Sequence, residues 1–359
     1  MPELRIAMIP GDGIGPEVSE ASRRLLHHVA GAVPGLIFEI EEWPWNAEYY
    51  LEHGRTMPPI GLALLEEFDA VFLGAIGDPR VPDHISLREL IFAIRQGFDQ
   101  YVNLRPVRLL NGVTSPLAGR GTSDFRMTFV RENSEGEYSG MGEFRNVGEE
   151  DEAALQTSVF TRRGVERIMR YAFDLARAKR LPLQSVSKAN ALNYSGVLWD
   201  VIFTGLQDDY PDVTSESLLV DAAALHMIQS PERFGVVVAS NLFGDILTDL
   251  GAALVGGLGL AASANINPQR TYPSMFEPVH GSAPDIAGQG IANPLASLWA
   301  TGMMLDHLLG PGWEEATVEA IERVLVDGHV RTPDLGGTAS TDEMTEAVLE
   351  TFRPVGESV

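Results

Sequence analysis

Short apolar runs alternate with segments of helical spacing along the whole chain. Segments such as Glu17–Val29 and Thr161–Lys179 repeat apolar residues at intervals of three and four, which predicts helices. Alternating strands and helices are typical of an α/β fold with a largely parallel sheet. Polar, Gly-containing stretches at Gly140–Asp151 and Asn265–Pro273 predict long loops. The predicted strands are Leu4–Ile9, Ala70–Leu73, Met127–Val130, Leu183–Val186, Ser217–Val220 and Val236–Ala239.

Polar residues of unusual kinds follow the ends of several predicted strands. Arg131, Lys188, Asp221 and the segment Ser240–Gly251 each follow the end of such a run. In open α/β sheets, ligands bind at the carboxyl ends of the strands. These residues are therefore candidates to share one crevice, although they lie far apart in the sequence.

Asp245 and Asp249 stand four positions apart in Ser240–Gly251 (SNLFGDILTDLG), which is otherwise apolar with helical spacing. In a helix they lie about 40° apart on one face. Two buried carboxylates repel each other unless a cation lies between them, and a hard divalent ion such as Mg²⁺ or Mn²⁺ suits their oxygens. Taken alone, the pair is also consistent with a solvated amphipathic face.

Further candidates are cationic or phenolic. Arg95, Arg105 and Arg131 can bind a substrate carboxylate through paired N–H donors, although each alone is more commonly part of a surface ion pair. Tyr138 is a candidate proton donor or a packing residue. Lys188 is flanked by small residues and an apolar strand, so it is either a base with a lowered pKa or a lysine that reaches the surface.

The Gly-rich opening Gly11–Pro16 follows the first predicted strand. Its glycines are spaced G-x-G-x-G, and His27 and His28 stand where a dinucleotide-binding fingerprint has an acidic residue. The Rossmann fingerprint is therefore absent. The opening either lets a ligand approach the backbone or closes a strand-to-helix corner.

Composition narrows the function classes. The chain has 359 residues, 45% of them hydrophobic, which is enough for about two domains of roughly 150 residues. A net charge of −24 disfavours nucleic acid and anionic membranes as partners. The absence of cysteine excludes disulfides and thiolate metal sites. No apolar run approaches the roughly 20 residues that span a bilayer, so a soluble cytoplasmic protein is expected.

Several segments, in family order, resemble the metal-dependent β-decarboxylating 2-hydroxyacid dehydrogenases, which include isopropylmalate, isocitrate, homoisocitrate and tartrate/D-malate dehydrogenases. The resemblance covers nearly the whole chain. Its segments are Ile9–Glu17, Asn103–Pro106, Arg131–Tyr138, Lys188–Asn190, Asp221, Ser240–Leu250 and Glu277–Gly288.

The resemblance implies an isocitrate/isopropylmalate dehydrogenase-like α/β fold, not a Rossmann fold, with two α/β domains that share a large mixed sheet. It assigns residues 1–100 and 256–359 to a cofactor-binding domain. Residues 101–255 would form an inserted domain for substrate, metal and dimerisation. The expected assembly is a homodimer with shared active sites, in which Lys188 and Asp221 reach the partner's site.

Site roles also follow from the resemblance. Arg95, Arg105 and Arg131 would bind the substrate carboxylates, and Asp245, Asp249 and the partner's Asp221 would surround Mg²⁺ or Mn²⁺. Lys188 resembles the base that takes the hydroxyl proton, and Tyr138 the acid that protonates the enolate. Both are expected to have lowered pKa values, with an adjacent cation contributing.

A loop at residues 280–293 resembles the family's adenosine-binding loop. An acidic residue accepts hydrogen bonds from an unphosphorylated ribose and repels a 2′-phosphate, so Asp285 and Ile286 indicate NAD. A K⁺ requirement stays open. The expected cofactor-binding residues are His280, Gly281, Ser282, Ala283, Asp285, Ile286 and Asn293.

The expected substrate is a small 2-hydroxy dicarboxylic acid. Segments such as Asp83–Leu87, Phe98–Asn103 and Phe160–Gly164 resemble the tartrate/D-malate branch, whereas Lys188–Asn190 is nearer the isopropylmalate form. Ile91 and Phe92, one turn before Arg95, are expected to form an apolar wall for an alkyl substituent. The alternatives are a 3-isopropylmalate dehydrogenase and a catalytically silent regulatory paralogue. A metal-dependent hydrolase or phosphotransferase is disfavoured because a Walker-type loop is absent.

Overall fold

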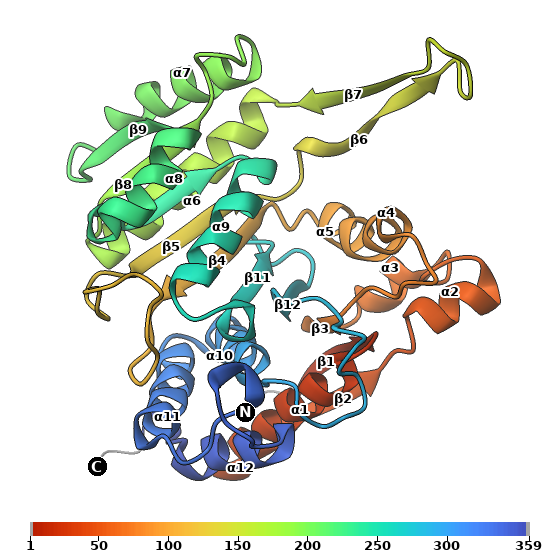
Figure 1. Ribbon diagram of the computed structural model, residues 1–359, viewed down its shortest axis with the longest axis vertical. Coiled ribbons are helices and arrows are strands. Elements are labelled where there is room, and N and C mark those ends of the chain that lie inside the picture. Colours follow the sequence, from red (N-terminus) through yellow and green to blue (C-terminus); the bar gives the residue numbers. More distant parts are fainter. Residues whose placement is uncertain (1–2, 357–359) are drawn as a thin grey trace. The chain divides into compact units, whose positions relative to one another are not determined.

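The computed structural model describes residues 3–356, which divide into two compact units (Figure 1). The first unit comprises the chain up to Gln100, Leu109–Ala118 and the chain from Ala252 onward. The second comprises Tyr101–Arg108 and Gly119–Gly251. This division differs from the expected domains at Leu109–Ala118 and at residues 252–255, which belong to the first unit.

The first unit is built on a mixed sheet with the strand order β2-β1-β3-β12-β11. β11 and β12 are antiparallel, and the other neighbours are parallel. The strands are β1 (Glu3–Gly11), β2 (Ile37–Glu42), β3 (Ala70–Ala75), β11 (Ala262–Ile266) and β12 (Ser274–Pro278). The helices are α1 (Gly15–Ala32), α2 (Ala47–His53), α3 (Gly61–Leu65), α4 (Asp83–Ser86), a π-helical segment (Leu87–Phe92), α5 (Ala93–Gly97), α10 (Leu295–Leu309), α11 (Trp313–Asp327) and α12 (Thr341–Thr351), with 3₁₀ turns at Leu258–Leu260 and Pro333–Leu335.

Apolar side chains cover both faces of this sheet. Alternate residues of β1 and β3, such as Ile9 and Leu73, pack in a buried cluster with Trp45 and Ile94. α1 and α10 also pack on these strands. Ile91 is a buried member of the same cluster and Phe92 packs partly buried against it, so their role as an apolar wall for a substrate stays a prediction. Burial on two faces explains why the strands are continuous apolar runs.

The second unit has a mixed sheet with the order β4-β5-β10-β8-β9. β4 and β5 are antiparallel, and the remaining neighbours are parallel. The strands are β4 (Val102–Arg108), β5 (Arg126–Glu132), β8 (Leu183–Ser187), β9 (Ser215–Leu219) and β10 (Val236–Ala239). The helices are α6 (Arg162–Lys179), α7 (Ser195–Gln207), α8 (Val220–Gln229) and α9 (Asn241–Leu254), with a 3₁₀ turn at Pro231–Arg233.

β6 (Gly136–Arg145) and β7 (Ala153–Val159) form a separate antiparallel hairpin in the second unit (Figure 1). The prediction of a loop over Gly140–Asp151 is therefore wrong for its first half. Most of the hairpin is exposed on both faces, with Met141 at 55% and Phe144 at 70% exposure. It consequently lacks the alternation of apolar and polar residues that marks a half-buried strand.

The predicted α/β class is confirmed in each unit. The six predicted strands and both predicted helices are present, except that Val220 begins α8 and Thr161 caps α6. Across residues 3–356, no helix is long and apolar enough to cross a membrane.

Candidate active site

α9 carries two of the three predicted metal ligands, Asp245 and Asp249, on one face beside predicted substrate arginines. β10 ends at Ala239, which is paired with Arg131 on β5, so the helix that follows β10 begins next to that arginine. Arg105 lies on β4, which pairs with β5. The order of the strands therefore gathers charged side chains at the carboxyl ends of β5 and β10, as in other open α/β sheets.

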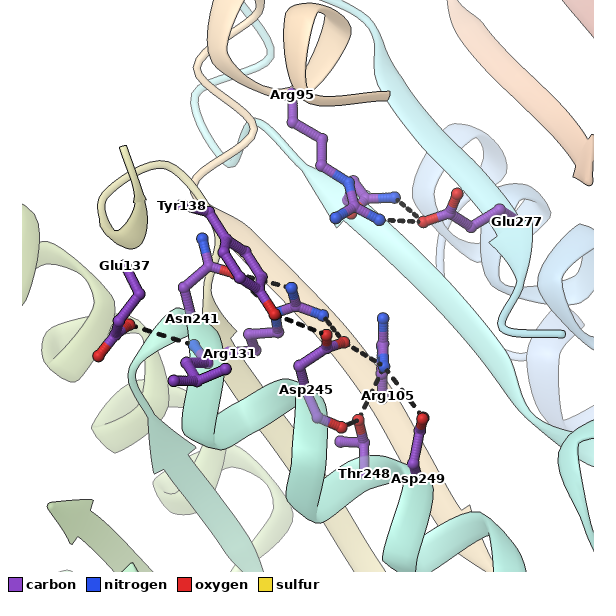
Figure 2. Close-up of polar contacts among 12 residues, drawn as sticks. Arg95, Arg105, Arg131, Glu137, Tyr138, Asn241, Asp245, Thr248, Asp249 and Glu277 are labelled. Carbon is purple, nitrogen blue, oxygen red and sulfur yellow. Dashed lines mark hydrogen bonds and ion pairs between the residues drawn. The ribbon is translucent and has the colours of Figure 1, made fainter. Parts of the chain in front are cut away.

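Asp245 is the centre of this cluster (Figure 2). Its Oδ1 accepts hydrogen bonds from Arg131 Nη1 and from Arg105 Nη1, the latter at 3.3 Å. Its Oδ2 accepts a hydrogen bond from the Tyr138 hydroxyl at 3.1 Å. Asp249 Oδ1 lies 3.9 Å from the same Arg105 nitrogen. The structure thus brings together five predicted site residues of the second unit.

The charges of this cluster balance, because two carboxylates face two guanidinium groups. Burial raises the pKa of Asp249, Arg105 opposes the rise and Asp245 adds to it. The side chains of Asp245 and Asp249 are still 35% and 60% exposed. A ligand can therefore reach both carboxylates.

Tyr138 has a pKa raised to about 12, first by burial and then by the adjacent Asp245 carboxylate. Arg131, whose guanidinium lies 5.7 Å from the ring centroid, acts in the opposite direction. Among the groups of this chain, burial and the Asp245 carboxylate outweigh Arg131, so the expected lowering of this pKa would require the adjacent cation. At neutral pH the hydroxyl keeps its proton and can donate it.

Lys188 and Asp221 form an ion pair, with Nζ 2.5 Å from Oδ1. β8 and β9 are parallel neighbours, and Ser187 is paired with Leu219, so the residues that follow the two strands meet. The lysine is thus not isolated from other charges, and its hydrogen bond lowers the pKa of Asp221. Within residues 3–356, neither side chain has a hydrogen bond or ion pair with the Asp245 cluster.

Arg95, the third predicted substrate arginine, lies on α5 in the first unit. Its Nη2 is 2.6 Å from Oε1 of Glu277 on β12, and the two side chains are 7% and 8% exposed. Asn265 donates from Nδ2 to the same oxygen at 2.8 Å. The guanidinium is therefore held by a buried carboxylate and not by solvent.

The predicted cofactor residues lie in the loop that follows β12 in the first unit. Burial lowers the pKa of His280, so its ring is neutral at pH 7. The Nδ1 atom lies 3.0 Å from Gly281 O, whereas the buried Nε2 has no hydrogen-bond partner among residues 3–356. At the other end, Asn293 accepts from Leu295 N and donates to Asp334. An unpaired buried ring nitrogen fits a site that a polar heterocycle completes.

Sequence comparison decides the family. The family model described as isocitrate/isopropylmalate dehydrogenase matches residues 5–348. The chain belongs to this family. A D-malate dehydrogenase (decarboxylating) of Escherichia coli is 50% identical, with 98% of this chain and 99% of that protein covered. A probable tartrate dehydrogenase/decarboxylase of Bacillus subtilis is 46% identical, with 98% and 99% covered.

Solved structures agree with the family assignment. The isocitrate dehydrogenase of Methylococcus capsulatus superposes with a TM-score of 0.86 at 37% identity, over 97% of this chain and 99% of that one. NAD and a divalent metal are typical of the isocitrate/isopropylmalate dehydrogenase family. The protein is accordingly a decarboxylating dehydrogenase that acts on a CH–OH group.

Sequence reasoning missed two polar residues in the Asp245 cluster of this family member. Asn241 Oδ1 accepts from Arg131 Nε and Nη2 at 3.0 and 2.7 Å, and Thr248 Oγ1 lies 2.8 Å from Arg105 Nη1. Both lie on the same face of α9 as Asp245, at positions one helical turn away. Helical spacing from Asp245 was therefore the signal that could have found them.

Proposed function

We propose that the protein is an NAD- and divalent-metal-dependent dehydrogenase that oxidatively decarboxylates D-malate or tartrate. The observation that carries this proposal is the meeting of Asp245 and Asp249 with Arg105 and Arg131 on one face of α9. Carboxylates suit a hard cation, and guanidinium groups suit the carboxylates of a small diacid. The names of the E. coli and B. subtilis relatives favour D-malate and tartrate among such acids.

The donor set fits Mg²⁺ or Mn²⁺, because Asp245 and Asp249 offer oxygen ligands from one exposed helical face. A bound divalent ion supplies Lewis acidity that stabilises negative charge developing on the substrate's 2-oxygen. Bound NAD would supply the acceptor for the hydride from C2. Arg95, Arg105 and Arg131 would bind the carboxylates of the substrate and so orient it.

Two side chains transfer protons in the proposed reaction. We assign Lys188 as the base that takes the 2-hydroxyl proton. After CO₂ leaves, the electron pair of the broken C–C bond forms an enolate, and Tyr138 protonates its carbon. The raised pKa of Tyr138 supports this role, because a donor must carry its proton at working pH.

The proposed enzyme is a homodimer. Among residues 3–356 no group of three acidic or histidine side chains can hold a metal, so a metal site with three protein carboxylates needs one from elsewhere. We propose that the partner's Asp221 supplies it. Apolar residues that are exposed on α7, α8 and α9 also support contact with a second copy of the chain: Val197, Val201, Leu225, Ile228 and Ile246.

The competing functions are separated by one assay. Formation of reduced nicotinamide is followed with Mn²⁺ and NAD on D-malate, L-tartrate, meso-tartrate, 3-isopropylmalate and isocitrate. We expect the highest kcat/KM on D-malate or a tartrate, and higher turnover with NAD than with NADP because Asp285 repels a 2′-phosphate. A preference for 3-isopropylmalate would establish the alternative, and no turnover on any acid would indicate a silent paralogue. Replacing K⁺ by tetramethylammonium in the same assay tests whether the enzyme requires K⁺. A cytoplasmic location stays a prediction.

A further inference from the structure

The Gly-rich opening packs against the predicted cofactor loop. Gly13 has a φ of +57°, and a Cβ there would lie 2.0 Å from Ser282 O. The next residue, Ile14, donates its backbone N–H to this same oxygen at 2.8 Å. Close approach of backbone to backbone explains this glycine, since neither the φ nor the space admits a side chain. The opening therefore packs against the loop at residues 280–293 through Ser282.

α1 continues this support from its first turn. Glu17 Oε1 accepts a hydrogen bond from Gly288 N at 2.7 Å. Ile14 and Val18 form a buried apolar cluster with Ala292, and Ala283 and Ile286 pack against it. One carboxylate and one apolar patch thus hold the middle of the loop against α1.

α12 holds the same part of the loop from another side. Its first residue, Thr341, donates its backbone N–H to Gly290 O at 2.8 Å and its hydroxyl to Ala292 O at 2.7 Å. The hydroxyl also lies 3.4 Å from Glu17 Oε2. α1 and α12 are packed side by side (Figure 1), so Glu17 and Thr341 act on adjacent loop residues.

The loop has little regular structure of its own. Its described internal backbone bonds are turns, from Ile286 N to Ala283 O and from Gln289 N to Ile286 O. A segment with so few internal bonds takes its conformation from the elements that contact it. Glu17 and Thr341 provide the polar part of those contacts.

We propose that Glu17 and Thr341 are positioning residues that hold residues 281–292 in the conformation that binds the nicotinamide dinucleotide. The proposal rests on the assignment of this loop to NAD in the proposed function. Neither residue needs to touch the dinucleotide. If the bound conformation falls to one tenth of the population, the apparent Kd rises about tenfold.

Binding of NADH to the full-length enzyme, followed by the fluorescence of the reduced nicotinamide, tests this without turnover. We expect Glu17→Ala and Thr341→Val each to raise the NADH Kd about tenfold. Glu17→Gln keeps an acceptor oxygen for Gly288 N and should stay within about threefold of wild type. Glu20→Ala, on the same helix but paired with Arg23, is the matched control and should not change the Kd.

Hydrogen exchange supplies the second measurement. Amides of residues 281–292 should exchange faster in Glu17→Ala and Thr341→Val, while exchange in α10 and the Kd for D-malate with Mn²⁺ stay as in wild type. Faster exchange with an unchanged NADH Kd, or a weaker Kd with unchanged exchange, would overturn the positioning role. Failure of the wild-type enzyme to bind NADH would instead refute the proposed cofactor.

Discussion

Lys188 and Asp221 are joined in an ion pair, Nζ to Oδ1 2.5 Å, on neighbouring strand ends of one chain. The Asp221 side chain is 65% exposed, and Lys188 is 28% exposed. The predicted base and one predicted metal ligand thus lie side by side at the surface. This arrangement suits delivery of both groups together into the site of a second copy.

Mixed dimers test this delivery. Asp221→Asn and Asp245→Asn should each inactivate a homodimer, because every site then lacks one metal carboxylate. A mixed dimer of the two chains has one site with Asp221, Asp245 and Asp249 all present. Random pairing of equal amounts should therefore recover about a quarter of wild-type activity, since half the dimers are mixed and each has one intact site.

The matched control for this experiment mixes Asp245→Asn with Asp249→Asn. Both lesions then lie in the same half of the site, so no pairing restores an intact set and no activity should return. Formation of mixed dimers is verified by native mass spectrometry. No recovery in either mixture, with mixed dimers present, would show that the sites are not shared.

Asp245→Asn should abolish metal binding while leaving the fold intact. The amide keeps an oxygen acceptor for Arg131 and Arg105, but it loses the charge that a divalent cation needs. We expect the Mn²⁺ affinity measured by calorimetry to fall more than tenfold, with Tm within a few degrees of wild type. Asp208→Asn, an exposed aspartate on the same unit, serves as the control. Unchanged Mn²⁺ affinity would remove Asp245 from the metal site.

Gly244→Ala should separate α9 from Arg131. A Cβ at this position would lie 2.8 Å from both Cβ and Cγ of Arg131, whose side chain is 2% exposed and cannot move aside. Overpacking of this kind costs about 1–3 kcal/mol, and the shift of Arg131 should lower kcat/KM at least tenfold. Chemical denaturation and steady-state kinetics measure the two effects.

Gly205→Ala is the corresponding control in α7, where a Cβ would have no atom within 4 Å. Alanine is a better helix former than glycine, so this change should be neutral or stabilise by up to about 1 kcal/mol, with full activity. If Gly244→Ala behaved like Gly205→Ala, the close approach of α9 to Arg131 would be refuted.

The sequence predicts those parts of the site that depend on local periodicity. Asp245 and Asp249 share a helical face because their spacing is four, and that face follows a buried strand whose apolar run is evident. The hairpin of β6 and β7 could not be predicted in this way, because strands exposed on both faces lack the alternation of apolar and polar residues.

Contacts between residues far apart in the sequence could not be predicted from local patterns. Glu277 binds Arg95 although 182 positions separate them, and no local pattern marks that pair. The raised pKa of Tyr138 depends on burial and on a carboxylate 107 positions away. Family resemblance names the participating residues, but only the folded chain shows which side chain neutralises which.

His307 makes the stability of the protein depend on pH. Burial on α10, with a smaller contribution from Arg270, lowers its pKa from 6.5 to about 4. The folded state therefore binds this proton less readily than the unfolded state does. The stabilising contribution is present above pH 6.5 and is lost as the pH falls towards 4, on the order of 3 kcal/mol in total at about 1.4 kcal/mol per pKa unit.

His307→Gln should remove this dependence. Its free energy of unfolding, measured by urea denaturation between pH 7 and 4, should decline less steeply than that of wild type. The difference in slope between the two curves should vanish below pH 4, because the folded wild-type protein then binds the proton as well. His329→Gln, at a ring that is 86% exposed, is the control and should follow the wild-type curve. Parallel curves for His307→Gln and wild type would show that the histidine takes its proton equally well in the folded and unfolded states.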